Sequence, residues 1–153
     1  MLRVSRMTDY ACVLMSCLGN ASGIVLSASD LAARTRLEPP TVSKLMKRLS
    51  RAGLVDSFRG AQGGYRLARA ADNISLADIV IAMEGPIGMT ECSVRAGRCD
   101  HEAHCGARRS WRRVSDIVVA TLRGVTLAEL QAPPPRVGPA RGPSLEPMMR
   151  AGS

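Results

Sequence analysis

Two short helical patterns in close succession within residues 27–53 restrict the possible folds more than any other feature of the chain. Ser27 and Asp30 have the spacing of a capping box, which predicts the start of a first helix. A second helix is predicted shortly afterwards, because Pro39 and Pro40 suit a first helical turn, where a missing N–H costs no hydrogen bond. Its apolar face has helical spacing and consists of Val42, Leu45, Met46 and Leu49.

Two extended runs follow the second helix. Residues 54–59 and 65–67 are joined by the glycine-rich segment 60–64, and this arrangement predicts a β-hairpin with a flexible tip. Helix, turn, helix and hairpin in this order predict a winged helix-turn-helix, which we place in residues 1–86. The expected fold class is mainly α-helical, with a small β-hairpin wing.

Two further helices complete this part of the chain. One is predicted over residues 8–19, with Thr8 as its N-terminal cap and Asp9 at the positive end of its dipole. The other begins at Ser75, which repeats the capping-box spacing with Asp78. The buried stripe predicted for this second helix consists of Leu76, Ile79, Val80 and Met83.

The C-terminal part is predicted to contain a long helix, a short helix and a tail. The long helix covers about residues 107–123, and its length and apolar side suit packing between the subunits of a dimer. A third capping box starts at Thr126, so residues 107–131 are interpreted as a dimerisation helix and a final short helix. Residues 132–153 are rich in proline, glycine, arginine and serine, which predicts disorder. The apolar side of the long helix consists of Trp111, Val114, Val118, Leu122 and Val125.

The charge of the chain indicates an anionic partner. Its formal net charge is +8 and its pI is about 10.1. Residues 1–70 contain eleven lysines and arginines against four acids, so the excess lies in the predicted DNA-binding half. No apolar run reaches the roughly 20 residues needed to cross a bilayer, and we expect a cytoplasmic protein without a membrane partner.

Double-stranded DNA is the expected partner, because the second helix of a helix-turn-helix lies in the major groove. Early residues of that helix can reach base edges, whereas later cations suit backbone phosphates, and an arginine beside the wing can enter the minor groove. An ordinary solvated helix face and an ordinary mobile hairpin are the alternatives. The predicted DNA-contacting residues are Thr41, Ser43, Lys44, Lys47, Arg48, Arg51 and Arg59.

Three of the five cysteines lie together in residues 87–106, with the spacing Cys92-x6-Cys99-x5-Cys105. Three thiolates on one polar segment between two helices can hold a metal centre. The spacing is wider than the paired knuckles of structural zinc sites, although His101 or His104 could complete a zinc tetrahedron. The remaining cysteines, Cys12 and Cys17, fall within the first predicted helix and are interpreted as buried thiols without a role.

Residues 1–130 resemble the Rrf2 family of bacterial winged-helix regulators. The resemblance rests on Ser5–Ala11, on Ala52–Val55, on the wing segment Arg59–Leu67, and on the three cysteines followed by Trp111. It implies a homodimer joined through the long helix. It also implies a 2Fe-2S or 4Fe-4S cluster held by the three cysteines, and operator binding that changes with the state of the cluster. The cysteine arrangement most resembles the members that regulate the SUF cluster-assembly genes, which implies a repressor of those genes.

The chain departs from the family at two positions. Arg108 stands where some members have a histidine ligand, three residues after the last cysteine. Ser43 replaces an acidic residue of those members, so their base preference is not carried over. The resemblance leaves the fourth ligand open, and the candidates are Asp9 of the partner subunit, His101, Glu102 and His104. Stabilisation of the helix dipole is the alternative role for Asp9.

Three other functions are alternatives to cluster-dependent control of SUF genes. One is a nitric oxide or redox-responsive regulator of the same family, and another is a winged-helix regulator with a zinc or thiol switch. A small iron-sulfur redox protein is the third. We expect neither enzymatic activity nor a small-molecule substrate, because the sequence contains no phosphate-cradling motif and no convincing nucleophile with a base.

Overall fold

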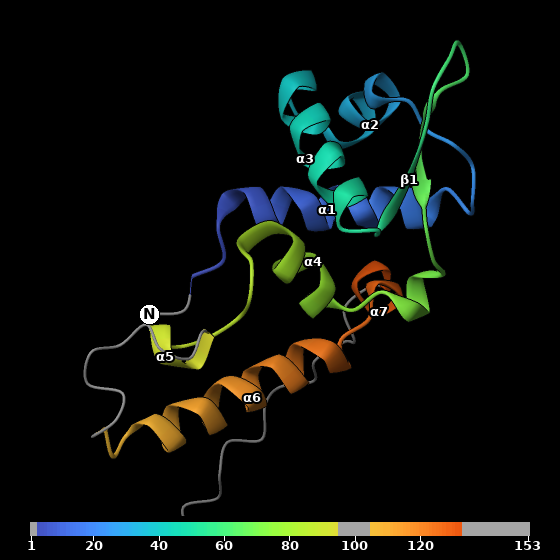
Figure 1. Ribbon diagram of the computed structural model, residues 1–153. Coiled ribbons are helices and arrows are strands. Elements are labelled where there is room, and N and C mark those ends of the chain that lie inside the picture. Colours follow the sequence, from blue (N-terminus) through green and yellow to red (C-terminus); the bar gives the residue numbers. More distant parts are fainter. Residues whose placement is uncertain (1–2, 95–104, 133–153) are drawn as a thin grey trace, which may run out of the picture.

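The computed structural model describes residues 3–94 and 105–132, and Figure 1 shows its course. Residues 133–153, for which disorder is predicted, lie outside the described part. The elements confirm a mainly α-helical fold with one two-stranded antiparallel hairpin. They are α1 (Arg6–Asn20), α2 (Ala28–Thr35), α3 (Pro39–Arg51), β1 (Val55–Phe58), β2 (Gly64–Leu67), the 3₁₀ helix η1 (Ala71–Asn73), α4 (Leu76–Glu84), α5 (Glu91–Val94), α6 (Arg108–Gly124) and α7 (Leu127–Gln131).

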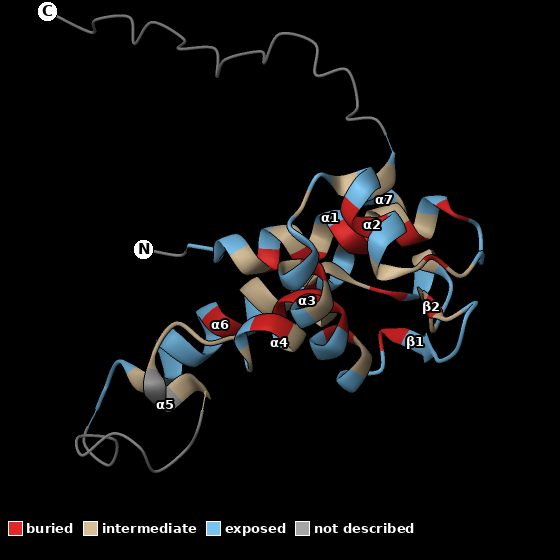
Figure 2. Cartoon of the chain, turned by 90° about the horizontal axis from the view of Figure 1, so that it is seen from above, coloured by how far each residue is buried: buried red, intermediate tan, exposed pale blue. Residues whose placement is uncertain are grey.

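Helix α1 is the centre of the structure. It contacts α2 and α3 on one side and α4 and α7 on the other (Figure 1). Buried residues gather where these helices meet, as Figure 2 shows. The apolar face predicted for α3 is confirmed, because its four residues are at most 1% exposed. The helix-turn-helix is therefore held on α1 by its own hydrophobic face.

Three of the helices begin with the predicted capping boxes. The Asp30 backbone N–H donates to Ser27 Oγ at 3.1 Å, and the Ser27 N–H donates to the Asp30 carboxylate at 3.0 Å. The same reciprocal pattern occurs at the starts of α4 and α7. Each box satisfies two backbone donors that a helix N-terminus leaves without a partner.

The cap predicted at Thr8 is wrong. Helix α1 begins two residues earlier, and its N-cap is Ser5, whose Oγ accepts the Thr8 backbone N–H at 3.2 Å. Thr8 is fully buried within the first turn, where its hydroxyl donates to Glu84 at the end of α4. The Ser5 cap therefore sets this boundary, and Thr8 instead makes a tertiary contact with a distant helix.

The buried stripe of α4 also differs by one position. Ile79, Val80 and Met83 are buried as predicted, but Ala77 is buried in place of Leu76. Helix α4 packs against α1, α3 and α6, so its buried surface is broader than one stripe. Leu76 is half-buried in the first helical position and lines a surface groove.

A third extended segment pairs with the hairpin, which the sequence did not reveal. Leu26 and Tyr65 exchange backbone hydrogen bonds of 2.9 and 2.8 Å on the outer side of β2. This close approach explains the glycine at position 64, because a Cβ there would lie 2.3 Å from the Leu26 carbonyl oxygen. The base of the wing is thereby fixed to the segment before α2.

Gly64→Ala is expected to lower the free energy of unfolding by about 1–3 kcal/mol, since Leu26 must move and its two backbone hydrogen bonds weaken. Urea unfolding followed by circular dichroism measures the change. Gly124→Ala is the matched control, because a Cβ at Gly124 meets nothing within 4 Å. Equal stability of both variants and the native chain would contradict the proposed need for glycine at position 64.

The end of α6 is joined to the start of α4. The Leu76 N–H donates to the Val125 carbonyl at 2.8 Å, and the Leu127 N–H donates to the Ile74 carbonyl at 2.7 Å. Ile74 and Leu127 are both fully buried. These bonds anchor the C-terminal end of α6 on the body formed by α1, α4 and α7.

Helix α6 agrees closely with the predicted long helix but is largely uncovered in the protomer. Ser115 is its single buried residue. On its predicted apolar side, Trp111 is 42% and Val114 39% exposed, and the neighbouring Ile117 is 57% exposed. The remaining predicted positions, Val118, Leu122 and Val125, are half-buried. Among the described residues, no helix is long and apolar enough to cross a membrane.

Candidate nucleic-acid interface and cysteine segment

The backbone at both ends of α3 sets the direction of this helix. Arg36, in the turn after α2, adopts a left-handed conformation with φ of 57°. At the other end, Gly53 has a φ of 73° and closes the helix with a Schellman motif. In this motif the Gly53 N–H donates to Ser50 at 3.0 Å and the Leu54 N–H donates to Leu49 at 3.1 Å.

The exposed face of α3 is cationic. At 3.6 residues per turn, Lys44, Lys47 and Arg51 lie opposite the buried face, and all three are exposed. Arg48 is exposed on one flank of the helix, while Thr41 and Ser43 are half-buried. Within the described ranges, no lysine or arginine of α3 forms an ion pair with a carboxylate. This face is therefore available to an anionic partner.

The wing lies on the same side of α1 as α2 and α3 (Figure 1). Arg59 is exposed and directly follows β1, at the start of the tip. The tip is a defined turn, since Gly60 has a φ of 104° and its carbonyl accepts the Gly63 N–H at 2.9 Å. A Cβ at Gly63 would lie 2.6 Å from the Phe58 carbonyl oxygen, so this glycine serves the turn itself.

Two interactions stiffen the hairpin below the tip. The Arg66 guanidinium lies over the Phe58 ring, 5.0 Å from its centroid. The same guanidinium is 3.5 Å from the Asp56 carboxylate on the paired strand. Both the arginine and the aspartate side chains are partly exposed, so the pair adds little to stability.

The described ends of the cysteine segment both lie beside α6. Cys92 is part of α5, a single helical turn that packs on α6, and Cys105 is exposed just before α6 begins. The Met89 N–H donates to Ser115 Oγ at 3.0 Å, and this fixes the approach to α5 on α6. Among the predicted ligands and candidates, Cys99, His101, Glu102 and His104 lie outside the described residues.

A hollow with a cationic lining adjoins Cys105. Arg108, Arg109 and Arg112 line it together with the cysteine. Within the described part of the chain, no three histidine, cysteine, aspartate or glutamate side chains form a metal site.

A family model described as an iron-dependent transcriptional regulator, Rrf2, matches residues 4–133. The chain belongs to the Rrf2 family. Among curated relatives, protein aau3 of Rhizobium meliloti is 31% identical over 89% of each chain. The HTH-type transcriptional regulator IscR of Erwinia tasmaniensis is 33% identical over 67% of this chain and 61% of the relative.

Solved structures of Rrf2 regulators confirm the winged-helix fold. CymR, the global cysteine regulator of B. subtilis, is 32% identical with a TM-score of 0.66, over 86% of this chain and 97% of CymR. The IscR of T. potens is 33% identical with a TM-score of 0.62, over 84% and 85% of the two chains. This Rrf2 protein is therefore a DNA-binding transcription regulator and not an enzyme.

Asp9 and Cys12 of this Rrf2 protein lie in a different place from Cys105. They line a groove of about 950 Å³ that also includes Val4, Leu76 and Leu130. Burial, and secondly the nearby Asp9 carboxylate, raise the pKa of the Cys12 thiol. Both Cys12 and Cys17 are half-buried in α1.

Glu84 makes a contact with the start of α1 that the sequence did not reveal. Its carboxylate accepts hydrogen bonds from the Ser5 N–H at 3.3 Å and from the Thr8 hydroxyl. These two partners lower the pKa of Glu84, and Arg48 contributes least to the same effect. Glu84 thus joins the start of α1 to the end of α4, one residue before Gly85, which has a φ of 90°. The connection toward the cysteines begins at this glycine.

Proposed function

We propose that this Rrf2 protein is a repressor that senses an iron-sulfur cluster and controls genes for cluster assembly of the SUF type. The cysteine segment, residues 87–106, would be the sensor, and the winged helix-turn-helix, residues 1–86, would bind the operator. The family membership and the description of the matching model as iron-dependent support this assignment. The SUF targets rest on the resemblance of the cysteine arrangement.

The observation that carries the proposal is the charge around Cys105. Thiolates and a bound iron-sulfur cluster together carry negative charge, and the hollow beside Cys105 is lined by Arg108, Arg109 and Arg112. Cations at this place would stabilise such a group electrostatically. Cys92, Cys99 and Cys105 are the proposed ligands of a 2Fe-2S or 4Fe-4S cluster. When bound, the cluster supplies reversible redox chemistry and sensitivity to oxygen, nitric oxide or iron supply.

The fourth ligand has candidates on both subunits. Asp9 and Cys105 of one protomer line separate hollows, so we propose that ligation by an aspartate would involve Asp9 of the partner subunit. His101, Glu102 and His104 are local candidates in the segment between Cys99 and Cys105.

A homodimer joined through α6 is part of the proposal. The uncovered apolar side of α6, with Trp111, Val114 and Ile117, supports it, because a second copy of the helix would remove these side chains from water. The segment that contains α5 packs on α6 at Ser115, the buried residue next to this uncovered side. A change at the cysteines would then alter how the two α3 helices of the dimer, the recognition helices, are placed relative to each other on the operator.

The test begins with anaerobically purified protein. Iron and acid-labile sulfide in stoichiometric amounts, with an absorption band in the visible range, are expected. A footprint on the DNA upstream of the protein's own operon should then change when the cluster is removed. A colourless protein with stoichiometric zinc would contradict the cluster proposal and favour a zinc switch.

Arg59→Ala is expected to weaken operator binding by about tenfold and leave the iron content unchanged, because it removes one wing cation far from the cysteine segment in sequence. Fluorescence anisotropy with labelled operator DNA and an iron assay measure the two effects. Arg123→Ala, at the last turn of α6, removes the same charge elsewhere. Loss of iron in Arg59→Ala, or equal DNA affinity of both variants, would count against this role of the wing.

A second candidate function is regulation of cysteine supply without a metal. The similarity to CymR, the global cysteine regulator of B. subtilis, favours it. Protein without iron, sulfide or zinc, and with operator binding that is indifferent to iron, would support this candidate over the first.

A further inference from the structure

A second cationic hollow lies between α3 and α4, and it joins two predicted DNA contacts to residues that have no role so far. Arg48 and Arg51 of α3 line one side of it, and Arg69, which follows β2, lines another. Asp78 and Ile81 of α4 and the buried Leu54 also line it. Cations from two separate parts of the chain therefore share one hollow of about 580 Å³.

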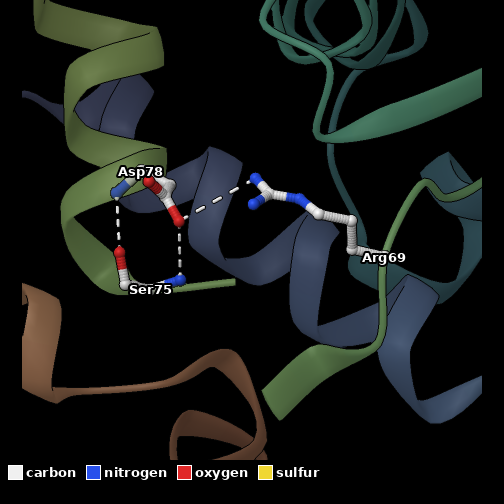
Figure 3. A network of polar contacts seen from close by, with 3 residues as sticks. All are labelled: Arg69, Ser75 and Asp78. Atoms are coloured by element: carbon white, nitrogen blue, oxygen red, sulfur yellow. Dashed lines mark hydrogen bonds and ion pairs between the residues drawn. The ribbon is translucent and has the colours of Figure 1, made fainter. Parts of the chain in front are cut away.

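The single carboxylate in this hollow is already engaged. Asp78 Oδ2 accepts the Ser75 N–H at 3.0 Å as part of the capping box of α4. Arg69 Nη2 lies 3.9 Å from the same oxygen, at the limit of an ion pair (Figure 3). Both side chains are more than a third exposed, so solvent weakens their attraction. The hollow keeps an excess of positive charge.

The position of the hollow beside α3 indicates what anion could occupy it. An α-helix in the major groove has a phosphate strand along each flank. Arg48 and Arg51 continue the cationic face that begins at Lys44, about one and two turns earlier on the same helix. Arg69 extends this face beyond α3, although it is distant from the recognition helix in sequence.

We propose that Arg69, together with Arg48 and Arg51, binds a backbone phosphate of duplex DNA beside the recognition helix, and that Asp78 competes with this phosphate for Arg69. The inference rests on the DNA-binding part of the proposed function and is independent of the cluster. It identifies Arg69 as a DNA contact and Asp78 as the residue that limits its strength.

Arg69→Gln in the full chain tests whether Arg69 binds a DNA phosphate. Binding to two labelled duplexes, the region upstream of the protein's own operon and a random sequence, is measured over a range of salt concentrations. We expect roughly five- to tenfold weaker binding to both duplexes, and a salt slope lower by about 0.9, the value for one phosphate contact. Arg123→Gln serves as the control for loss of one exposed charge elsewhere. An Arg69→Gln slope equal to that of the control would overturn the proposal.

Asp78→Asn tests whether Asp78 competes with the phosphate for Arg69. The expected result is a gain of DNA affinity, which a misfolded variant would not show. Asparagine keeps an oxygen that can accept the Ser75 N–H, so the helix cap is retained while the negative charge is lost. We expect about threefold tighter binding to both duplexes, and no gain when Arg69→Gln is combined with Asp78→Asn. Unchanged affinity in a folded Asp78→Asn variant would contradict the competition.

A free phosphate-bearing molecule is the other source of the same chemistry. If inorganic phosphate at constant ionic strength stabilised the native chain but not Arg69→Gln, while their DNA slopes were equal, the DNA assignment would be overturned. Lys44→Ala distinguishes failure of the Arg69 proposal from failure of DNA binding through α3. If Lys44→Ala weakens DNA binding and Arg69→Gln does not, only the hollow is misassigned; if neither does, DNA binding through α3 fails as well.

Discussion

Cys99→Ala is expected to abolish the iron-sulfur cluster while leaving the chain folded and dimeric. Two cysteine thiolates would remain, which is too few to retain a cluster through purification. Iron and sulfide analysis with an absorption spectrum, recorded anaerobically, should show at least a tenfold loss. Circular dichroism and light scattering should show an unchanged fold and mass, because the described core is formed by α1 to α4 and α7.

Cys17→Ala is the matched control for this prediction. Cys17 is half-buried in α1, and burial raises the pKa of its thiol, so it is poorly suited to act as a thiolate ligand. We expect full cluster content in this variant. Equal iron loss in both variants would mean that the loss reflects general instability, and full iron content in Cys99→Ala would exclude Cys99 as a ligand.

Ile117→Glu is expected to convert the proposed dimer to a monomer and to weaken operator binding by about 100-fold. Ile117 is 57% exposed in the protomer, so a charge there costs little within one chain, but it would be desolvated between two α6 helices. Binding by one recognition helix would lose the avidity of two linked half-sites. Size-exclusion chromatography with light scattering and anisotropy on operator DNA measure both effects.

Ile24→Glu provides the control for oligomeric state. Ile24 is 63% exposed in the segment between α1 and α2, away from the predicted dimer helix. It should remain dimeric. A dimeric Ile117→Glu variant would place the subunit interface elsewhere on the surface.

Local sequence signals were sufficient for much of the fold. The capping boxes at Ser27, Ser75 and Thr126 predicted three helix starts, because both hydrogen bonds of each box form within four consecutive residues. The buried face of α3 followed from apolar spacing alone. The hairpin followed from glycine placement between two extended runs.

Long-range contacts account for the differences. The contact between Thr8 and Glu84 joins residues 76 positions apart in sequence, so no local pattern could indicate that Thr8 is buried against α4. The pairing of Leu26 with Tyr65 is similarly distant, although the Gly63-Gly64 pair was a signal of close backbone approach. Ala77 replaced Leu76 in the buried surface because three helices surround α4.

The candidate site was predictable to different degrees in its two parts. The cations of α3 lie on its exposed side, as helical periodicity requires. Arg69 was missed because its position in the hollow depends on the course of the chain after β2. The cysteine ligands remain a prediction, since Cys99 and its neighbours lie outside the described residues.

The paired backbone of Ile74–Leu76 and Val125–Leu127 holds the C-terminal end of α6 against the start of α4. With 17 residues, α6 is about 25 Å long, so a tilt of roughly 10° about its fixed C-terminal end would move its first turn by about 4 Å. Cys105 lies just before the opposite, N-terminal end of α6, and the paired backbone belongs to the DNA-binding half of the chain. Small rearrangements around the thiols would therefore be transmitted along α6 to the DNA-binding half, as smaller displacements of α4 and α7.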